Sequence, residues 1–396
     1  MSRPPVMYLL AAYLPVSACG PTPAHGPAHH RVDTLANGAL RVTNSGDALW
    51  APSQAWTTVE DLRIGRVNGS GPDRFGFIGP IAVDLEGRIL VADALANDVR
   101  VFHGDGTFSH SFGGEGQGPG QLSGITGMTL DPRGTVIINE GRNLRFSVFA
   151  SDGSFIATYP RNYFSRLRPW PGRVIPGLGL VDWAVELPWD DSYPGGSRLV
   201  FRPLGLGPDL ASRDSFPAIE FDMPFTAGNA PRPFSGTIRL NVDRHGDIWF
   251  FNTRRYEIFR RTLSGDTTLV FSLPHEPAIV TPEERSALVR EWIAPRRIDP
   301  SDVYDTKWSL HQVVVDDAGH VLAFPDPEDP ERATRLDVFD TAGVFQGTVT
   351  LATPLWILNR QPVATGGFLY GVTTDDLDVQ YVVRLRLGAN VVAGSL

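Results

Sequence analysis

The chain has 396 residues, of which 42% are hydrophobic and 20% charged, and it carries a net charge of −9. This composition is typical of a folded globular protein, and the 10% of aromatic residues argue against disorder despite 41 glycines and 33 prolines. The sequence contains no basic run, so we expect no nucleic-acid partner. Its only cysteine is Cys19, which excludes an internal disulfide.

The N-terminus has the features of an export signal. Arg3 is the positive charge at its start, residues 6–14 are a short apolar stretch, and Val16-Ser17-Ala18-Cys19 is similar to the lipobox of bacterial lipoproteins. The apolar stretch is too short to remain as a membrane-spanning helix. We therefore expect residues 1–18 to be a signal peptide. Cys19 would carry the lipid that anchors the mature chain in the bacterial cell envelope, at the outer membrane or cell surface.

The segment that follows the lipobox reads as a tether. Residues 21–30 are mainly Pro, Ala, Gly and His, a composition that favours a linker over a packed domain. Its histidines, His25, His29 and His30, are expected to be solvated rather than metal ligands. We assign residues 19–55 to this lipidated tether and an N-terminal extension.

An internal repeat of 47 residues then determines the fold prediction. Its first two copies match at several positions, namely Asp84 and Asp131, Gly87 and Gly134, Phe102 and Phe149, Gly106 and Gly153, and Phe108 and Phe155. Each copy contains short runs of Val, Ile and Phe separated by Asp-x-x-Gly or Asp-Gly turns, which is the pattern of four antiparallel strands. One such sheet cannot bury both of its faces, but several sheets packed radially can.

Weaker copies follow at residues 161–217, 241–265, 313–343 and 366–387, which gives six units. The motifs resemble those of NHL-repeat six-bladed β-propellers over residues 56–388. The resemblance implies an all-β fold of six four-stranded antiparallel blades, followed by a short tail at 389–396. Residues 56–67 precede the first unit and are placed to complete the last blade and close the ring.

One segment interrupts the strands. Thr281-Pro282-Glu283-Glu284 is a capping box with Pro at the first helical position, and we expect a short inserted helix over about residues 282–293. It would cover one face of the ring.

Sequence motifs for catalysis are absent. The glycine-rich stretch at 113–120 lacks the Gly-Lys-Ser/Thr ending of a phosphate loop, and the acidic run at 326–331 lacks the spacing of a calcium loop. The position six residues after each turn glycine holds Asp93, Glu140, Asn252 and Pro325. We interpret these residues as caps of the bend between the second and third strands rather than as a ring of ligands.

The central channel is where propeller enzymes usually act, and there the first strand of each blade contributes. No carboxylate recurs near the starts of these strands, and the polar residues found there are Arg239, His311 and Gln312. From the alternation of the core residues we expect Arg239 and His311 to face the channel and to bind an anionic or polar ligand.

These observations favour a binding or scaffold propeller at the cell envelope, with a protein or polymer as its ligand. We expect its loop face to take part, because aromatic and arginine residues such as Tyr163, Trp170, Trp189, Arg254, Arg255 and Tyr256 suit an interface. The alternative is a lactonase-like hydrolase or a lyase with a divalent metal in the channel, as in related propellers. The lack of a repeated metal-ligand pattern counts against this enzyme, and no metal-ligating or catalytic residue is assigned.

Overall fold

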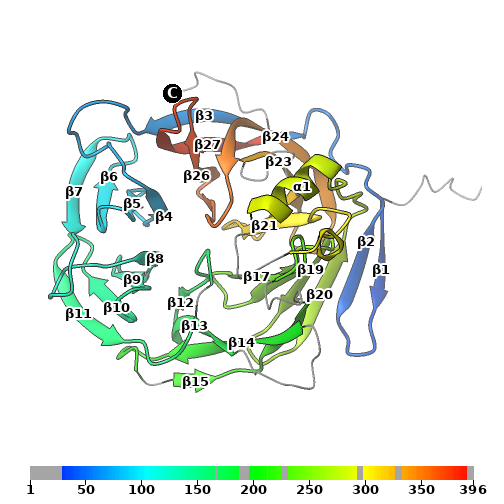
Figure 1. The fold of residues 1–396 in the computed structure, drawn as a ribbon, viewed down its shortest axis with the longest axis horizontal. Coiled ribbons are helices and arrows are strands. Elements are labelled where there is room, and N and C mark those ends of the chain that lie inside the picture. Colours follow the sequence, from blue (N-terminus) through cyan, green and yellow to red (C-terminus); the bar gives the residue numbers. More distant parts are fainter. Residues whose placement is uncertain are drawn as a thin grey trace, which may run out of the picture.

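The computed structural model describes residues 29–165, 167–186, 196–211, 213–224, 231–291, 298–325 and 332–389. Cys19, the predicted signal peptide at residues 1–18, the tail after residue 389 and the acidic run at 326–331 lie outside these ranges. The described strands form six sheets that are arranged radially in a ring (Figure 1). The predicted six-bladed β-propeller is therefore confirmed.

The first two blades repeat the same hairpins. Blade one consists of β4 (Ile78–Val83), β5 (Ile89–Asp93), β6 (Asp98–Phe102) and β7 (Phe108–Gly113). Blade two consists of β8 (Ile125–Leu130), β9 (Val136–Glu140), β10 (Arg145–Phe149) and β11 (Phe155–Pro160). The first turn of each blade has its glycine at a positive φ, +77° for Gly87 and +83° for Gly134, which explains why glycine recurs there.

Blade three departs from this pattern. It contains β12 (Arg173–Ile175), β13 (Gly179–Glu186), β14 (Gly196–Leu206), β15 (Arg213–Ser215) and β16 (Ile219–Pro224). The long β14 pairs with β15 near its end and with β16 near its start, so two short strands share the place of one outer strand.

Blade four carries an addition that the sequence did not predict. Its strands are β17 (Ile238–Val242), β18 (Ile248–Asn252), β19 (Glu257–Arg261) and β20 (Thr267–Ser272). A hairpin of β1 (His30–Thr34) and β2 (Leu40–Asn44) extends the sheet on the outside of the ring, with β2 parallel to β20 (Figure 1). Asn44 fixes it, because its buried Nδ2 donates to the carbonyls of Ser272 and Gly343 and its Oδ1 accepts from the amide of Phe345.

Blades five and six complete the ring. Blade five contains β21 (Leu310–Val315), β22 (Val321–Pro325), β23 (Arg332–Phe339) and β24 (Phe345–Trp356). Blade six contains β25 (Val363–Thr365), β26 (Phe368–Thr374), β27 (Gln380–Ala389) and, as its outer strand, β3 (Trp56–Ile64). The pairing of β3 with β27 confirms that the segment before the first repeat closes the ring.

Six apolar clusters form the core of the ring, and each of them lies between two neighbouring blades. Strand alternation explains this arrangement. Ile137 and Ile138 are adjacent in β9, yet Ile137 packs against blade three and Ile138 against blade one. Each buried side chain of this size contributes about 1.5–3 kcal/mol relative to exposure, so every blade depends on both of its neighbours.

The inserted helix α1 (Pro282–Glu291) lies between blades four and five and is followed by the short 3₁₀ helix η1 (Pro300–Asp302). The predicted capping box is present, since the amide of Glu284 donates to Thr281 Oγ1 and the amide of Thr281 donates to Glu284 Oε2. No helix in the described part of the chain combines the length and the apolar character needed to cross a membrane.

Candidate functional site: the central channel

The channel is a cavity of about 1070 Å³ that is lined by residues from all six blades. One end is formed by the starts of the inner strands and the linkers before them, such as Phe77, Thr126 and Arg168. The other end is formed by the turns that follow the inner strands, such as those at Asp84, Asp131 and Asp316. Its walls therefore combine backbone from every repeat with side chains that differ from blade to blade.

Arginine dominates the charged part of the lining. The arginines that line the channel or the cavity beside it are Arg88, Arg133, Arg168, Arg173, Arg239, Arg244 and Arg360. The acidic lining residues are Asp84, Glu86, Asp131, Asp316 and Asp317. Three of these acids serve the turns, because Oδ1 of Asp84, Asp131 and Asp316 accepts backbone amides of its own turn. The channel is thus richer in positive charge than a chain of net charge −9 would suggest.

The predicted residues Arg239 and Gln312 line a second cavity of about 330 Å³, which shares Arg168 and Asn359 with the channel. Arg239 Nη1 donates to the carbonyl of Arg168 at 2.8 Å, while its buried Nε has no hydrogen-bond partner in the described structure. Burial lowers the pKa of Arg239 from its usual value, but arginine remains charged at neutral pH. Gln312 is buried, and its Oε1 accepts the amide of Val313 at 3.2 Å.

The third predicted residue, His311, lies elsewhere. Its side chain is buried beside Trp308, with 5.5 Å between the ring centroids, and it lines neither of these two cavities. Alternation along the strand does not decide which side chains reach the channel. Val313 and Val314 are adjacent in β21 and pack against blades four and six, respectively.

Arg173, at the start of β12, is a channel residue that the sequence reading missed. Burial lowers the pKa of its guanidinium, an effect that Asp243 and Asp317 oppose and Arg244 adds to. No carboxylate of the described residues comes within ion-pair distance of it. Blade three lacks the Asp-x-x-Gly turn that follows the first strand in blades one, two, four and five, so the sequence offered no marker from which to locate this position.

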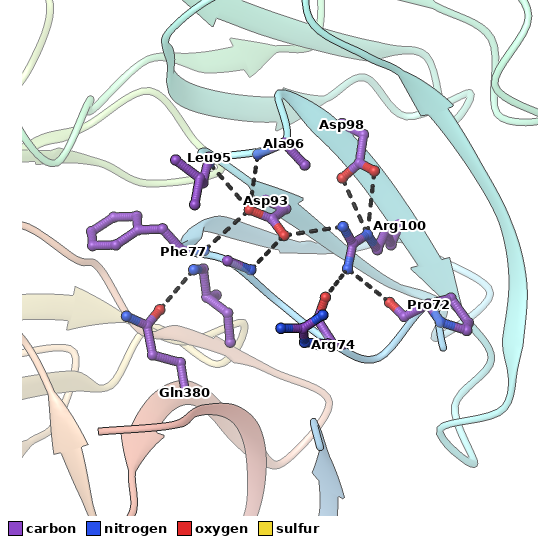
Figure 2. A network of polar contacts seen from close by, with 11 residues as sticks. Pro72, Arg74, Phe77, Asp93, Leu95, Ala96, Asp98, Arg100 and Gln380 are labelled. Atoms are coloured by element: carbon purple, nitrogen blue, oxygen red, sulfur yellow. Dashed lines mark hydrogen bonds and ion pairs between the residues drawn. The ribbon is translucent and has the colours of Figure 1, made fainter. Parts of the chain in front are cut away.

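Asp93, which ends the second strand of blade one, caps the bend that follows it, as predicted. Asp93 accepts the amides of Leu95 and Ala96 at the bend and the amides of Gly76 and Phe77 in the incoming linker (Figure 2). Arg100 Nη2 pairs with Asp93 at 3.0 Å, and its Nη1 donates to the carbonyls of Pro72 and Arg74 (Figure 2). Asp93 therefore ties the bend of blade one to the linker that enters the blade.

The prediction that aromatic loop residues are exposed for an interface is wrong for two of them, Trp170 and Tyr256. Trp170 and Tyr256 are both 6% exposed, and their polar atoms bind Asp182 and Asp337, respectively. Arg254 stacks on Tyr304, with its guanidinium carbon 4.1 Å from the ring centroid, and Trp189 lies outside the described residues. Trp170 and Tyr256 were expected to be exposed because they lie in loops. They are buried, with hydrogen bonds to Asp182 and Asp337.

Within the ranges that the structure describes, no three His, Cys, Asp or Glu side chains are grouped so that they could hold a metal ion. We therefore derive no step through a metal.

No known protein family matches the chain, and no curated protein matches it either. Several solved structures are similar in fold. A protein of Bacteroides fragilis NCTC 9343 named as a candidate exported protein has 12% identity and a TM-score of 0.49, with 83% of this chain and 95% of that chain covered. A member of the DUF4221 family from Bacteroides vulgatus ATCC 8482 has 9% identity and the same TM-score, with 85% and 99% covered. A streptogramin B lyase has 14% identity and a TM-score of 0.42, with 84% and 98% covered.

Proposed function

We propose that this chain is an exported, lipid-anchored binding module whose propeller takes up anionic groups of a polymer or protein ligand through its central channel. The observation that supports it most concerns two arginines, Arg173 in the channel and Arg239 in the cavity beside it. Neither has a carboxylate partner among the described residues. A cavity of about 1070 Å³ has the size of a ligand site.

The physical argument is one of charge compensation. A guanidinium withdrawn from water loses hydration energy, and a partner of opposite charge restores much of that energy. Two other arginines of low exposure have such partners, since Arg161 has Asp182 at 2.7 Å and Arg145 has Glu140 at 2.7 Å. Arg173 and Arg239 lack one, and both line open space rather than packed core. An anionic ligand would supply the missing charge.

Binding of purified protein to polygalacturonate and to poly-glutamate, with neutral dextran as the reference, tests this function. We expect both polyanions to bind, dextran not to bind, and the affinity to fall with added salt. Arg173→Gln should weaken binding by about tenfold or more, because a hydrogen bond to a charged group contributes about 1.5–3 kcal/mol. Arg31→Gln, an exposed arginine of β1, is the matched control. Equal binding of dextran, or equal affinity of the Arg173→Gln variant, would contradict the proposal.

The anchor is a separate part of the proposal. It is supported by the Val16-Ser17-Ala18-Cys19 motif and by the linker that follows it. In a bacterial host fed labelled palmitate, the wild-type chain should be labelled and fractionate with membranes, whereas Cys19→Ser should not. Equal labelling of the two would show that Cys19 is not the lipid site.

A further inference from the structure

The side chains that line the cavity beside the channel are rich in hydrogen-bond donors and carry no negative charge. It measures about 330 Å³ and is lined by residues of the linker into blade three and of blades four, five and six, and none of its lining residues is acidic. Arg168 and Arg239 are its cations, and Gln312 and Asn359 are its amides. All four side chains can donate hydrogen bonds.

Arg239 is the residue that defines this cavity. Its Nε is shielded from solvent and has no acceptor in the described structure, although buried donors are almost always paired. Among the described residues, the hydrogen bond of this guanidinium runs from Nη1 to the neutral carbonyl of Arg168. No opposite charge of the described residues therefore offsets the desolvation of this guanidinium. Desolvation lowers the pKa of Arg239.

Gln312 lines the same cavity as Arg239. Its Oε1 is occupied by the amide of Val313, which leaves Nε2 as the donor end of the side chain. Arg168 is exposed at the rim, where the cavity and the channel meet. A buried guanidinium, a buried amide donor and a second guanidinium at the entrance together match the needs of an oxyanion.

We propose that this cavity is an oxyanion subsite, which binds a carboxylate or phosphate group through Arg239 and Gln312 while Arg168 closes on it from the channel side. The inference deepens the proposed function and rests on it only for the identity of the natural ligand. Carboxylates and phosphates share the recognition chemistry, and the experiment separates them.

Thermal unfolding and ligand titration of the purified chain test the subsite with small anions. Phosphate or acetate is compared with chloride at matched ionic strength. We expect one of these anions, or both, to raise Tm by about 1–3 °C at tens of millimolar, because a ligand that binds only the folded state stabilises it. Whichever anion acts identifies the class of group that the subsite takes.

Two variants and one control decide the outcome. Arg239→Gln should weaken anion binding at least tenfold. Gln312→Glu places a carboxylate beside Arg239, so it should abolish the anion effect and raise Tm without added anion. Arg31→Gln should respond as the wild type does. An equal anion effect in all four proteins, or none in the wild type, would overturn the subsite.

The result is independent of the polymer experiment. Loss of the small-anion effect with retained polyanion binding would reject the subsite and leave the proposed function standing. Retained small-anion binding with no polyanion binding would support the subsite and reject the proposed function.

Discussion

Blades one and two hold their incoming linkers with an acid and an arginine from the blade itself, whereas blade three holds its linker with one buried aspartate. In blade two, Glu140 accepts the amide of Ser123 in the linker and pairs with Arg145, whose other nitrogens donate to the carbonyls of Gln117 and Gln121. Blade one repeats this arrangement with Asp93 and Arg100 (Figure 2). In both blades, side chains of the blade bind backbone of the linker.

In blade three the direction is reversed, because side chains of the linker bind the blade. Arg161 and Trp170 donate to the carboxylate of Asp182 on β13 at 2.8 and 2.6 Å, and the hydroxyl of Tyr163 donates to the same carboxylate. Asp182 is fully buried. The comparison teaches that a blade must have its linker fixed, but that the residues which do so need not repeat.

The largest effect is expected at Asp182. Asp182→Ala would leave Arg161, whose side chain is 2% exposed, as an uncompensated buried charge, at a cost of about 3–5 kcal/mol of unfolding free energy. Glu186→Gln on the same strand is the control. It breaks an exposed pair with Arg202 and should cost less than about 1 kcal/mol. Urea unfolding measures both, and a similar shift for the two variants would show that the buried cluster is not what holds the linker of blade three.

The next effect concerns the contact between blades two and three. A Cβ at Gly127 would lie 2.1 Å from Trp170 Cε3, and Trp170 is held in place by Asp182. Gly127→Ala should therefore destabilise the protein by about 1–3 kcal/mol through overpacking. In blade one, a Cβ at Gly79 would meet Ala94 Cβ at 3.3 Å, so Gly79→Ala should have a clearly smaller effect. Equal unfolding midpoints for the two variants would mean that Trp170 moves aside freely.

A smaller effect is expected for the repeated caps. Glu140→Gln keeps the shape of the side chain and leaves the bonds from Arg145 to Gln117 and Gln121 in place, so it should cost about 1–2 kcal/mol. Asp93→Asn should lower the free energy of unfolding by about the same amount, because Asp93 binds a linker amide and an arginine in blade one as Glu140 does in blade two. Denaturant midpoints test this equivalence. A loss for either variant as large as that for Asp182→Ala would remove the distinction between the blades.

The smallest effect depends on pH. Burial, together with the charge and hydrogen bond of Asp182, raises the pKa of Tyr163 above its usual range. An acid whose folded-state pKa is raised adds stability that is complete below the unfolded pKa, about 10, and is lost as pH rises above it. Tyr163→Phe should lower stability by about 1 kcal/mol at pH 8, where it removes one hydrogen bond.

The difference between wild type and Tyr163→Phe should then narrow as pH rises from 9 to 11, as measured by urea unfolding at each pH. The comparison is made between the two proteins because Tyr256 also has a raised pKa and gives both the same background. A difference that widens with pH would contradict the assigned cause of the shift.

The sequence alone determined the blade count, the hairpin turns, the closing strand and the inserted helix. Each of these features follows from a local sequence pattern, such as the turn at Gly87 or the capping box at Thr281, or from a repeat of fixed period. It also singled out Arg239 and Gln312, because their positions are anchored by the recognisable turns that end the inner strands.

Only the tertiary structure decided which side chains meet. The hairpin of β1 and β2 joins blade four more than 220 residues away in the chain through contacts such as Asn44 to Ser272, and no local pattern encodes that pairing. Trp170 and Tyr256 are buried because Asp182 and Asp337 lie opposite them. Arg173 lines the channel because it begins β12, the inner strand of blade three, whose sequence lacks the turn that marks the inner strands of blades one, two, four and five. The turn chemistry of a propeller is local and repeats, whereas the contents of its channel are set by six separate segments brought together by packing.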